Sequence, residues 1–159
     1  MLAVNTTQIA TNATRLRPQG LVMGTTVLTL DGEIPVEYLA AGDRIITRNG
    51  ARKLVGVTAT VVKDLKVVRI MAGVLGHDAP EADVVLGSEQ AILVRDWRAK
   101  ALSGRASAMI EAHRLVDGQF IRAETLAQAR VFTLHFDEAA VIYASALELS
   151  CPVAAPVTA

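Results

Sequence analysis

Short runs of β-branched and apolar residues recur along the chain and alternate with turn-forming residues. An Asp-Gly pair at 31–32 and an Asn-Gly pair at 49–50 each separate two such runs. Both pairs favour tight hairpin turns because they tolerate a left-handed backbone. The runs lie too close together to leave room for helices of about 10–15 residues between parallel strands. The pattern therefore predicts an all-β domain, with strands at residues 25–30, 44–47, 54–62, 66–71, 82–86 and 91–94.

Three further segments are read from local pattern. Residues 36–39 are compatible with a single helical turn. Residues 106–115 contain enough good helix formers for a helix, but tertiary packing often overrides propensity, so helix and strand both stay open there. Residues 131–136 alternate in a strand-like manner, which puts Phe132, Leu134 and Phe136 on one face, the predicted core side.

The composition excludes several classes of protein. Apolar residues make up 52% of the 159 residues, which is too many for a disordered chain and enough for one domain with its own core. Sixteen basic and sixteen acidic residues cancel, so no overall field favours nucleic acid. The apolar runs are too short for a spanning helix of about 20 residues, so we expect no membrane insertion and a soluble chain.

The two ends of the chain differ in composition from the middle. Residues 1–19 are rich in Thr and Asn and are predicted to be a flexible leader without the charge pattern of a signal peptide. Residues 20–151 form the predicted β domain, and the Pro-containing residues 152–159 a flexible tail. The sequence leaves open whether the protein is cytoplasmic or exported by a non-classical route.

Residues 20–47 begin Gly-Leu-Val-Met-Gly-Thr and continue through Asp-Gly and Gly-Asp turns. This segment resembles the opening of a Hedgehog/intein (Hint) domain, in which the first position is Cys. The segments at 69–76, 95–99 and 115–118 and the Phe-Asp at 136–137 are similar to an alphaproteobacterial branch of the family. The resemblance implies a horseshoe of curved antiparallel strands, partly closed and with little helix.

The chain departs from the family at its reactive positions. Gly20 stands where the family has its cysteine nucleophile, and Gln90 where it has a histidine. Counting back from Trp97 puts Gly87 at the family's Ser or Thr position; a shift of one residue would give Ser88 and Ala91 instead. A later His-acidic pair corresponds to Ala139-Ala140. Glycine has no nucleophilic side chain and glutamine transfers no proton, so no catalytic residue is expected.

Other reactive side chains have ordinary structural interpretations. Thr25 and Thr26 are the nearest hydroxyls to Gly20 in sequence, but β-branched residues are typical of strands. Cys151 has no neighbouring cation that would activate its thiol. His77, His113 and His135 lack the short spacings of metal sites, so no metal is expected. His135 is expected to pair with Asp137 two residues on.

A sole tryptophan in a small domain is usually part of the core, and we expect Trp97 to be partly buried. The sequence names no ligand, and no cofactor is expected. The leading hypothesis is a catalytically inactive Hint-like domain that acts as a protein-interaction or structural module for an unidentified partner. Two alternatives are an autoprocessing domain with a non-cysteine nucleophile and a small-molecule-binding β domain.

Overall fold

The computed structural model describes residues 20–76 and 79–151 and consists mainly of antiparallel β-strands. The strands and the three short helices are β1 (Leu21–Val22), β2 (Thr26–Thr29), β3 (Gly32–Pro35), η1 (Val36–Tyr38), β4 (Arg44–Thr47), β5 (Gly50–Lys53), β6 (Gly56–Ile70), β7 (Val84–Gly87), β8 (Ala91–Val94), α2 (Trp97–Ser103), β9 (Ala108–Glu111), η2 (Ala112–Leu115), β10 (Ile121–His135), β11 (Ala140–Ala144) and β12 (Leu147–Cys151).

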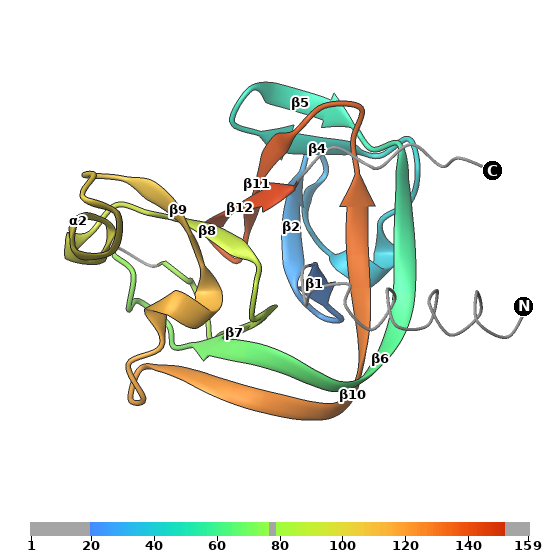
Figure 1. Ribbon diagram of the computed structural model, residues 1–159. Helices are drawn as coiled ribbons and strands as arrows, with labels where there is room; N and C mark the ends of the chain where they lie inside the picture. The colour runs from blue at the N-terminus through green and yellow to red at the C-terminus, as the bar shows by residue number, and fades with distance from the viewer. Residues whose placement is uncertain (1–19, 77–78, 152–159) are drawn as a thin grey trace, which may run out of the picture.

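The first sheet is built on two long, paired strands, β6 and β10 (Figure 1). They pair antiparallel from Gly56↔His135 to Ile70↔Ile121 and bend together. β7 pairs with the second half of β6, β1 pairs with β10, and a single pair between β1 and β7 completes a ring of four strands. The predicted partly closed, curved arrangement of antiparallel strands is confirmed.

The second sheet has eight strands and contains the last strand of the domain, β12. Its order is β3-β2-β4-β11-β12-β8-β9, and β5 pairs with β4 as a side branch. Both predicted hairpins are present: Asp31 and Asn49 lie in the turns between β2 and β3 and between β4 and β5, and Gly32 and Gly50 are the first residues of β3 and β5. The last strand, β12, lies between β11 and β8 and is therefore central rather than at an edge.

One large apolar cluster lies between the two sheets, and a smaller one contains Leu65, Val67 and Val131. Phe132, Leu134 and Phe136 all belong to the large cluster, as their alternation predicts. Val131 from the opposite face is also buried, in the smaller cluster. The long strand therefore carries apolar contacts on both faces, which explains why its pattern is not a simple polar and apolar alternation.

Some predicted elements differ from the structure. The runs at 54–62 and 66–71 are one strand, β6, rather than two, because pairing with β10 continues on both sides of Asp64, whose φ is 51°. Within residues 106–115, where helix and strand both stayed open, residues 108–111 form a strand. The helix α2 is an unpredicted element, although its signals are in the sequence: Asp96 caps its start by accepting from the Arg98 amide, and Gly104 ends it.

The expectation of a partly buried Trp97 is wrong, since 72% of this residue is exposed at the start of α2. Its ring packs against the guanidinium of Arg98, at 4.9 Å from the ring centroid, and not against the core. Ala99 is the residue by which α2 is anchored in the core. In this short helix the small Ala99 side chain faces the core and the large Trp97 side chain faces outward.

The predicted leader, 1–19, and tail, 152–159, lie outside the described residues. Within the described part of the chain, no helix has the length and apolar character needed to cross a bilayer.

Candidate functional site

Gly20 stands directly before β1 and faces β10. Its φ is +105°, a conformation that L side chains rarely adopt. A Cβ atom built on Gly20 would lie 2.9 Å from the carbonyl oxygen of Phe132 and 3.0 Å from a methyl group of Val131. The backbone and the neighbouring strand therefore leave no room for a side chain at this position, where the resemblance implies the family's thiol.

Gln90 lies at the end of a tight turn between β7 and β8, and 5% of it is exposed. The turn closes through a hydrogen bond from the Gln90 amide to the carbonyl of Gly87. Two further backbone bonds hold it from η2: Ala112 donates to the Gln90 carbonyl, and His113 donates to the Ser88 carbonyl. These bonds fix the position from which the Gln90 side chain extends.

The carboxamide of Gln90 joins the two ends of the domain. Its Oε1 accepts from the backbone N–H of Gly20 at 3.2 Å, and its Nε2 donates to the carbonyl of Ser150 at 2.8 Å. Nε2 also donates to the Ala91 carbonyl at 3.1 Å. We call these contacts the Gln90 bridge. Both polar ends of a buried side chain are satisfied, which is what a buried amide requires.

The bridge brings together residues far apart in sequence, because Gln90 is 70 positions from Gly20 and 60 from Ser150. The Gly20 nitrogen is the amide nitrogen of the peptide bond between residues 19 and 20, the bond that the resemblance implies would break. Of the two possible registers of the resemblance, the one with Gln90 puts a side chain at this nitrogen. A carboxamide there can accept a hydrogen bond but does not titrate near neutrality.

The other two positions singled out by the resemblance, Gly87 and Ala139, differ in how close they lie to the Gln90 bridge. Gly87 is buried at the end of β7, pairs with Val67 and bonds Gln90 only through the backbone. Ala139 is exposed in the connection between β10 and β11, and its methyl group offers no polar atom. The structure therefore assembles Gly20, Gln90 and Gly87 at one place, with Ala139 outside the Gln90 bridge.

Thr25 and Thr26 are held in β-sheet contacts. Thr25 is buried and its carbonyl accepts from the Val36 amide, while the Thr26 carbonyl accepts from Ser145. Thr133 is a hydroxyl that the sequence analysis did not single out: its Oγ1 lies 3.4 Å from the point where a Cβ of residue 20 would be. Only the pairing of β1 with β10 brings it there, and the sequence contains no local signal of it.

The histidines have other partners. His135 contacts the hydroxyl of Thr58 through Nε2 at 2.6 Å, so the expected pair with Asp137 is wrong; β6 supplies a partner across the ladder. His113 contacts Glu111 at 3.2 Å. His77 lies outside the described residues. In residues 20–76 and 79–151, no three His, Cys, Asp or Glu side chains lie close enough to hold a metal ion.

The Cys151 thiol follows Ser150 at the end of β12, and burial raises its pKa to about 12. A thiolate is the reactive form, and this pKa leaves very little of it near neutrality. We therefore expect iodoacetamide to modify folded protein at pH 8 at least about 100-fold more slowly than protein unfolded in guanidinium. Intact mass against time measures both rates. Equal rates in the two states would contradict a buried, protonated thiol.

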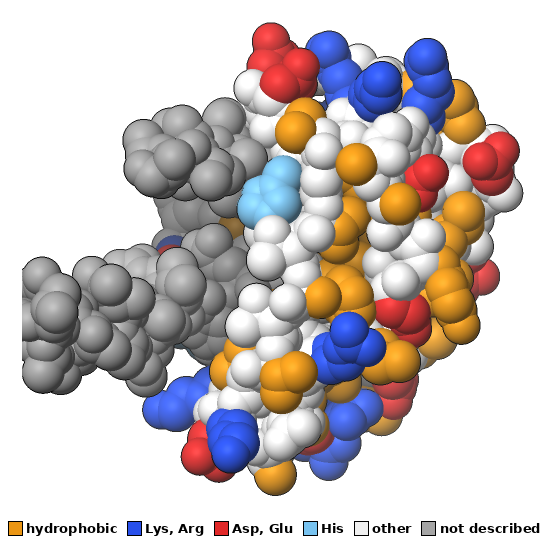
Figure 2. Space-filling view, turned by 90° about the vertical axis from the view of Figure 1, so that its right-hand side faces the viewer, with side chains coloured by type: hydrophobic (Ala, Val, Ile, Leu, Met, Phe, Trp, Pro, Cys, Tyr) orange, Lys and Arg blue, Asp and Glu red, His pale blue; other side chains and the backbone are white. Residues whose placement is uncertain are grey.

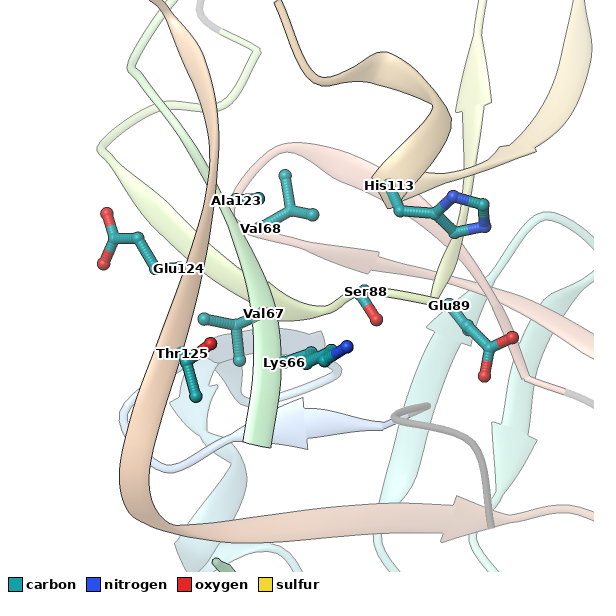
Figure 3. Close-up of a pocket in the computed structure, with 9 residues that line it drawn as sticks. All are labelled: Lys66, Val67, Val68, Ser88, Glu89, His113, Ala123, Glu124 and Thr125. Atoms are coloured by element: carbon teal, nitrogen blue, oxygen red, sulfur yellow. The ribbon is translucent and has the colours of Figure 1, made fainter. Parts of the chain in front are cut away.

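An open hollow of about 580 Å³ lies beside the turn that carries Gln90 (Figure 3). Lys66 and Val67 of β6, Ser88 and Glu89 of the turn, and His113 of η2 are among its lining residues. Glu124 also lines it, but Figure 3 shows its carboxylate on the far side of β10, where Arg69 binds it at 2.7 Å. This pairing lowers the pKa of Glu124, so the carboxylate stays charged and engaged.

Comparison with known proteins gives the family of the architecture. The model of the Hint domain family matches residues 19–150. A bacterial intein-like domain from Clostridium thermocellum is similar over 84% of this chain and 98% of its own, with 15% identity and a TM-score of 0.61. A DnaB intein from Synechocystis sp. PCC 6803 is similar over 85% of this chain and 100% of its own, with 12% identity and a TM-score of 0.57. No curated protein matches the chain.

Proposed function

This chain belongs to the Hint domain family, and from that premise we propose that it is a catalytically inactive member that works as a structural or protein-interaction module. The observation that carries the proposal is the Gln90 bridge. A neutral carboxamide accepts from the amide nitrogen of residue 20, and residue 20 itself has no side chain. The two groups that would start self-cleavage are replaced by groups without that chemistry.

The chemical reason concerns both halves of the first step. An acyl shift at the 19–20 peptide bond needs a nucleophile on residue 20 and a group that delivers a proton to the leaving nitrogen. Gly20 supplies no nucleophile, and the Gln90 side chain, with Oε1 directed at this nitrogen, presents an acceptor rather than an acid. Such groups act as a unit, so losing both removes more than two separate contributions.

A structural role follows from what the Gln90 bridge does instead. It links the start of β1 to the end of β12 and so fixes the two ends of the domain next to one another. The surface also has apolar side chains available for a partner: Tyr38, Val55 and Val61 are each more than half exposed. Figure 2 shows hydrophobic side chains on the face that it presents, with Lys and Arg both at its upper edge and in its lower part.

Autoprocessing with a hydroxyl nucleophile is the second candidate, and one contact favours it. Thr133 Oγ1 lies beside Gly20, at 3.4 Å from the missing Cβ position. Attack by this hydroxyl on the carbonyl of residue 19 would form an ester on Thr133, break the 19–20 bond and release the Gly20 amine. No base in the Gln90 bridge would take up the hydroxyl proton, which is why we favour the inactive module.

The test is a fusion of a stable carrier protein to the N-terminus, incubated with and without thiol or hydroxylamine and followed by intact mass. We expect no cleavage, with an active Hint domain assayed in parallel as the positive control. Cleavage between residues 19 and 20 would overturn the proposal. If cleavage occurs, Thr133→Val, Thr25→Ala and Thr26→Ala identify the hydroxyl responsible, because only the variant lacking the nucleophile stays intact.

A further inference from the structure

The hairpin of β4 and β5 carries four cations and lies at the top of the molecule in Figure 1. They are Arg44, Arg48, Arg52 and Lys53. Arg48 lies 3.7 Å from the buried carboxylate of Glu148, which also binds Arg95. The other three form no ion pair with any carboxylate in the described part of the chain. The hairpin therefore has uncompensated positive charge on a chain whose net charge is zero.

Two of these cations are placed directly opposite one another. Arg44 and Lys53 are cross-strand partners in the ladder, and both residues are exposed. Like charges at opposite positions of an antiparallel pair are destabilising, where a favourable pair would contribute about 0.2–1 kcal/mol. Among the residues that the structure describes, neither Arg44 nor Lys53 has an ion-pair partner, which is the arrangement expected where an anionic partner supplies the missing charge.

The same hairpin offers unpaired main-chain groups. Within residues 20–76 and 79–151, β5 pairs only with β4, so among these residues its other side is an open sheet edge. The Leu54 amide donates to the Asp43 carbonyl, which makes that pair hydrogen-bonded. Residues of an antiparallel pair alternate between bonded and non-bonded positions, so the N–H and C=O groups of Ala51 and Lys53 point toward the open edge. All four residues of β5 are exposed.

We propose that β5 binds an extended, acidic segment of a partner protein by strand addition. The inference rests on the proposed function, because it identifies the surface and the partner chemistry of the interaction module. Main-chain bonds to Ala51 and Lys53 would supply the pairing. Because side chains alternate along a strand, a row of carboxylates would lie beside Arg44 and Lys53 on one face of the sheet or beside Arg52 on the other.

Other occupants fit this edge less well. Residues 1–19 and 152–159 contain no Asp or Glu, so they cannot supply the acidic strand. A second copy would bring the same cations to the edge and be repelled, which is how charged edges prevent self-association. A nucleic acid has no main-chain amides to pair with the edge, and specific binders typically neutralise about 6–10 phosphates, more than three cations can.

The binding test uses fluorescence anisotropy with two labelled peptides of about ten residues, one alternating Glu with Val and one alternating Gln with Val. We expect the Glu peptide to bind and the Gln peptide to bind at least about 10-fold more weakly. The combined variant Arg44→Gln, Arg52→Gln and Lys53→Gln should also bind the Glu peptide at least about 10-fold more weakly than the parent protein does. Lys63→Gln, Lys100→Gln and Arg105→Gln together remove as much charge elsewhere and should bind as the parent does.

Ala51→Pro separates strand addition from charge attraction. It removes an N–H that faces the open edge and leaves the ladder with β4 intact, so the domain should keep its thermal midpoint yet bind the Glu peptide at least about 5-fold more weakly. Unchanged affinity of this variant would overturn strand addition. Tighter binding of a single-stranded oligonucleotide than of the Glu peptide, or no binding of the Glu peptide at about 1 mM, would also overturn the inference. The cleavage assay on the carrier fusion decides the proposed function independently of these results.

Discussion

Replacing Gln90 by Ala is expected to lower the free energy of unfolding by about 3 kcal/mol. The substitution leaves the Gly20 N–H and the Ser150 carbonyl without their side-chain partner at the join of the two domain ends. A buried polar group left without a partner costs roughly 1–3 kcal/mol. For a domain of this size the loss corresponds to a fall of roughly 10 °C in the thermal midpoint, measurable by circular dichroism or calorimetry.

The companion variant Gln90→Glu tests which end of the carboxamide matters. A carboxylate still accepts from Gly20, but it has no N–H for Ser150 and Ala91 and faces their carbonyl oxygens. Burial and these acceptors favour the protonated form, so the pKa of this Glu should be raised in the folded state. Stability from the protonated form is present at low pH and lost as pH rises through that raised pKa.

Urea unfolding of Gln90→Glu at pH 5 and pH 8, each referred to the parent protein at the same pH, measures this effect. We expect the loss in the free energy of unfolding, relative to the parent protein, to be larger at pH 8. A deficit that does not change with pH would mean that the two carbonyls are not close to the side chain. An Ala variant as stable as the parent would show that the Gln90 bridge contributes nothing to holding the ends together.

Introducing the family's thiol as Gly20→Cys is expected to destabilise the fold, by about 3 kcal/mol, rather than to restore a reaction. The positive φ costs a side chain roughly 1–2 kcal/mol. The new Cβ would also meet the Phe132 carbonyl at 2.9 Å, and this oxygen belongs to the strand that pairs with β1. Relieving the contact requires β1 and β10 to separate, which adds strain of about 1–3 kcal/mol.

Gly24 provides the matched control for this variant. Its φ is +95°, close to that of Gly20, but no atom of the described residues lies within 4 Å of its missing Cβ. Gly20→Ala and Gly24→Ala therefore share the conformational cost, and only Gly20→Ala should show the additional loss from the contact. Denaturant unfolding of both variants gives the difference. Equal losses would mean that β10 yields easily and that a side chain at residue 20 is tolerated.

Several mistakes in the sequence interpretation have one physical origin. The Lys-Asp at 63–64 is typical of a turn, yet a partner strand runs along both sides of it and keeps β6 continuous. Trp97 is a large apolar residue of the kind usually found in a core, but in α2 the residue that faces the core is Ala99. His135 contacts Thr58 on the paired strand β6 rather than Asp137. In each case a contact between distant segments outweighs a local preference.

The sequence by itself determined the all-β class, the two Asx-Gly hairpins and the buried face of Phe132, Leu134 and Phe136, because turn chemistry and side-chain alternation act over a few residues. It also carried enough of the family pattern to indicate the domain. Only the tertiary structure decided what Gln90 touches. Its partners are 60 and 70 positions away, and no local pattern specifies a meeting that depends on the closure of two sheets.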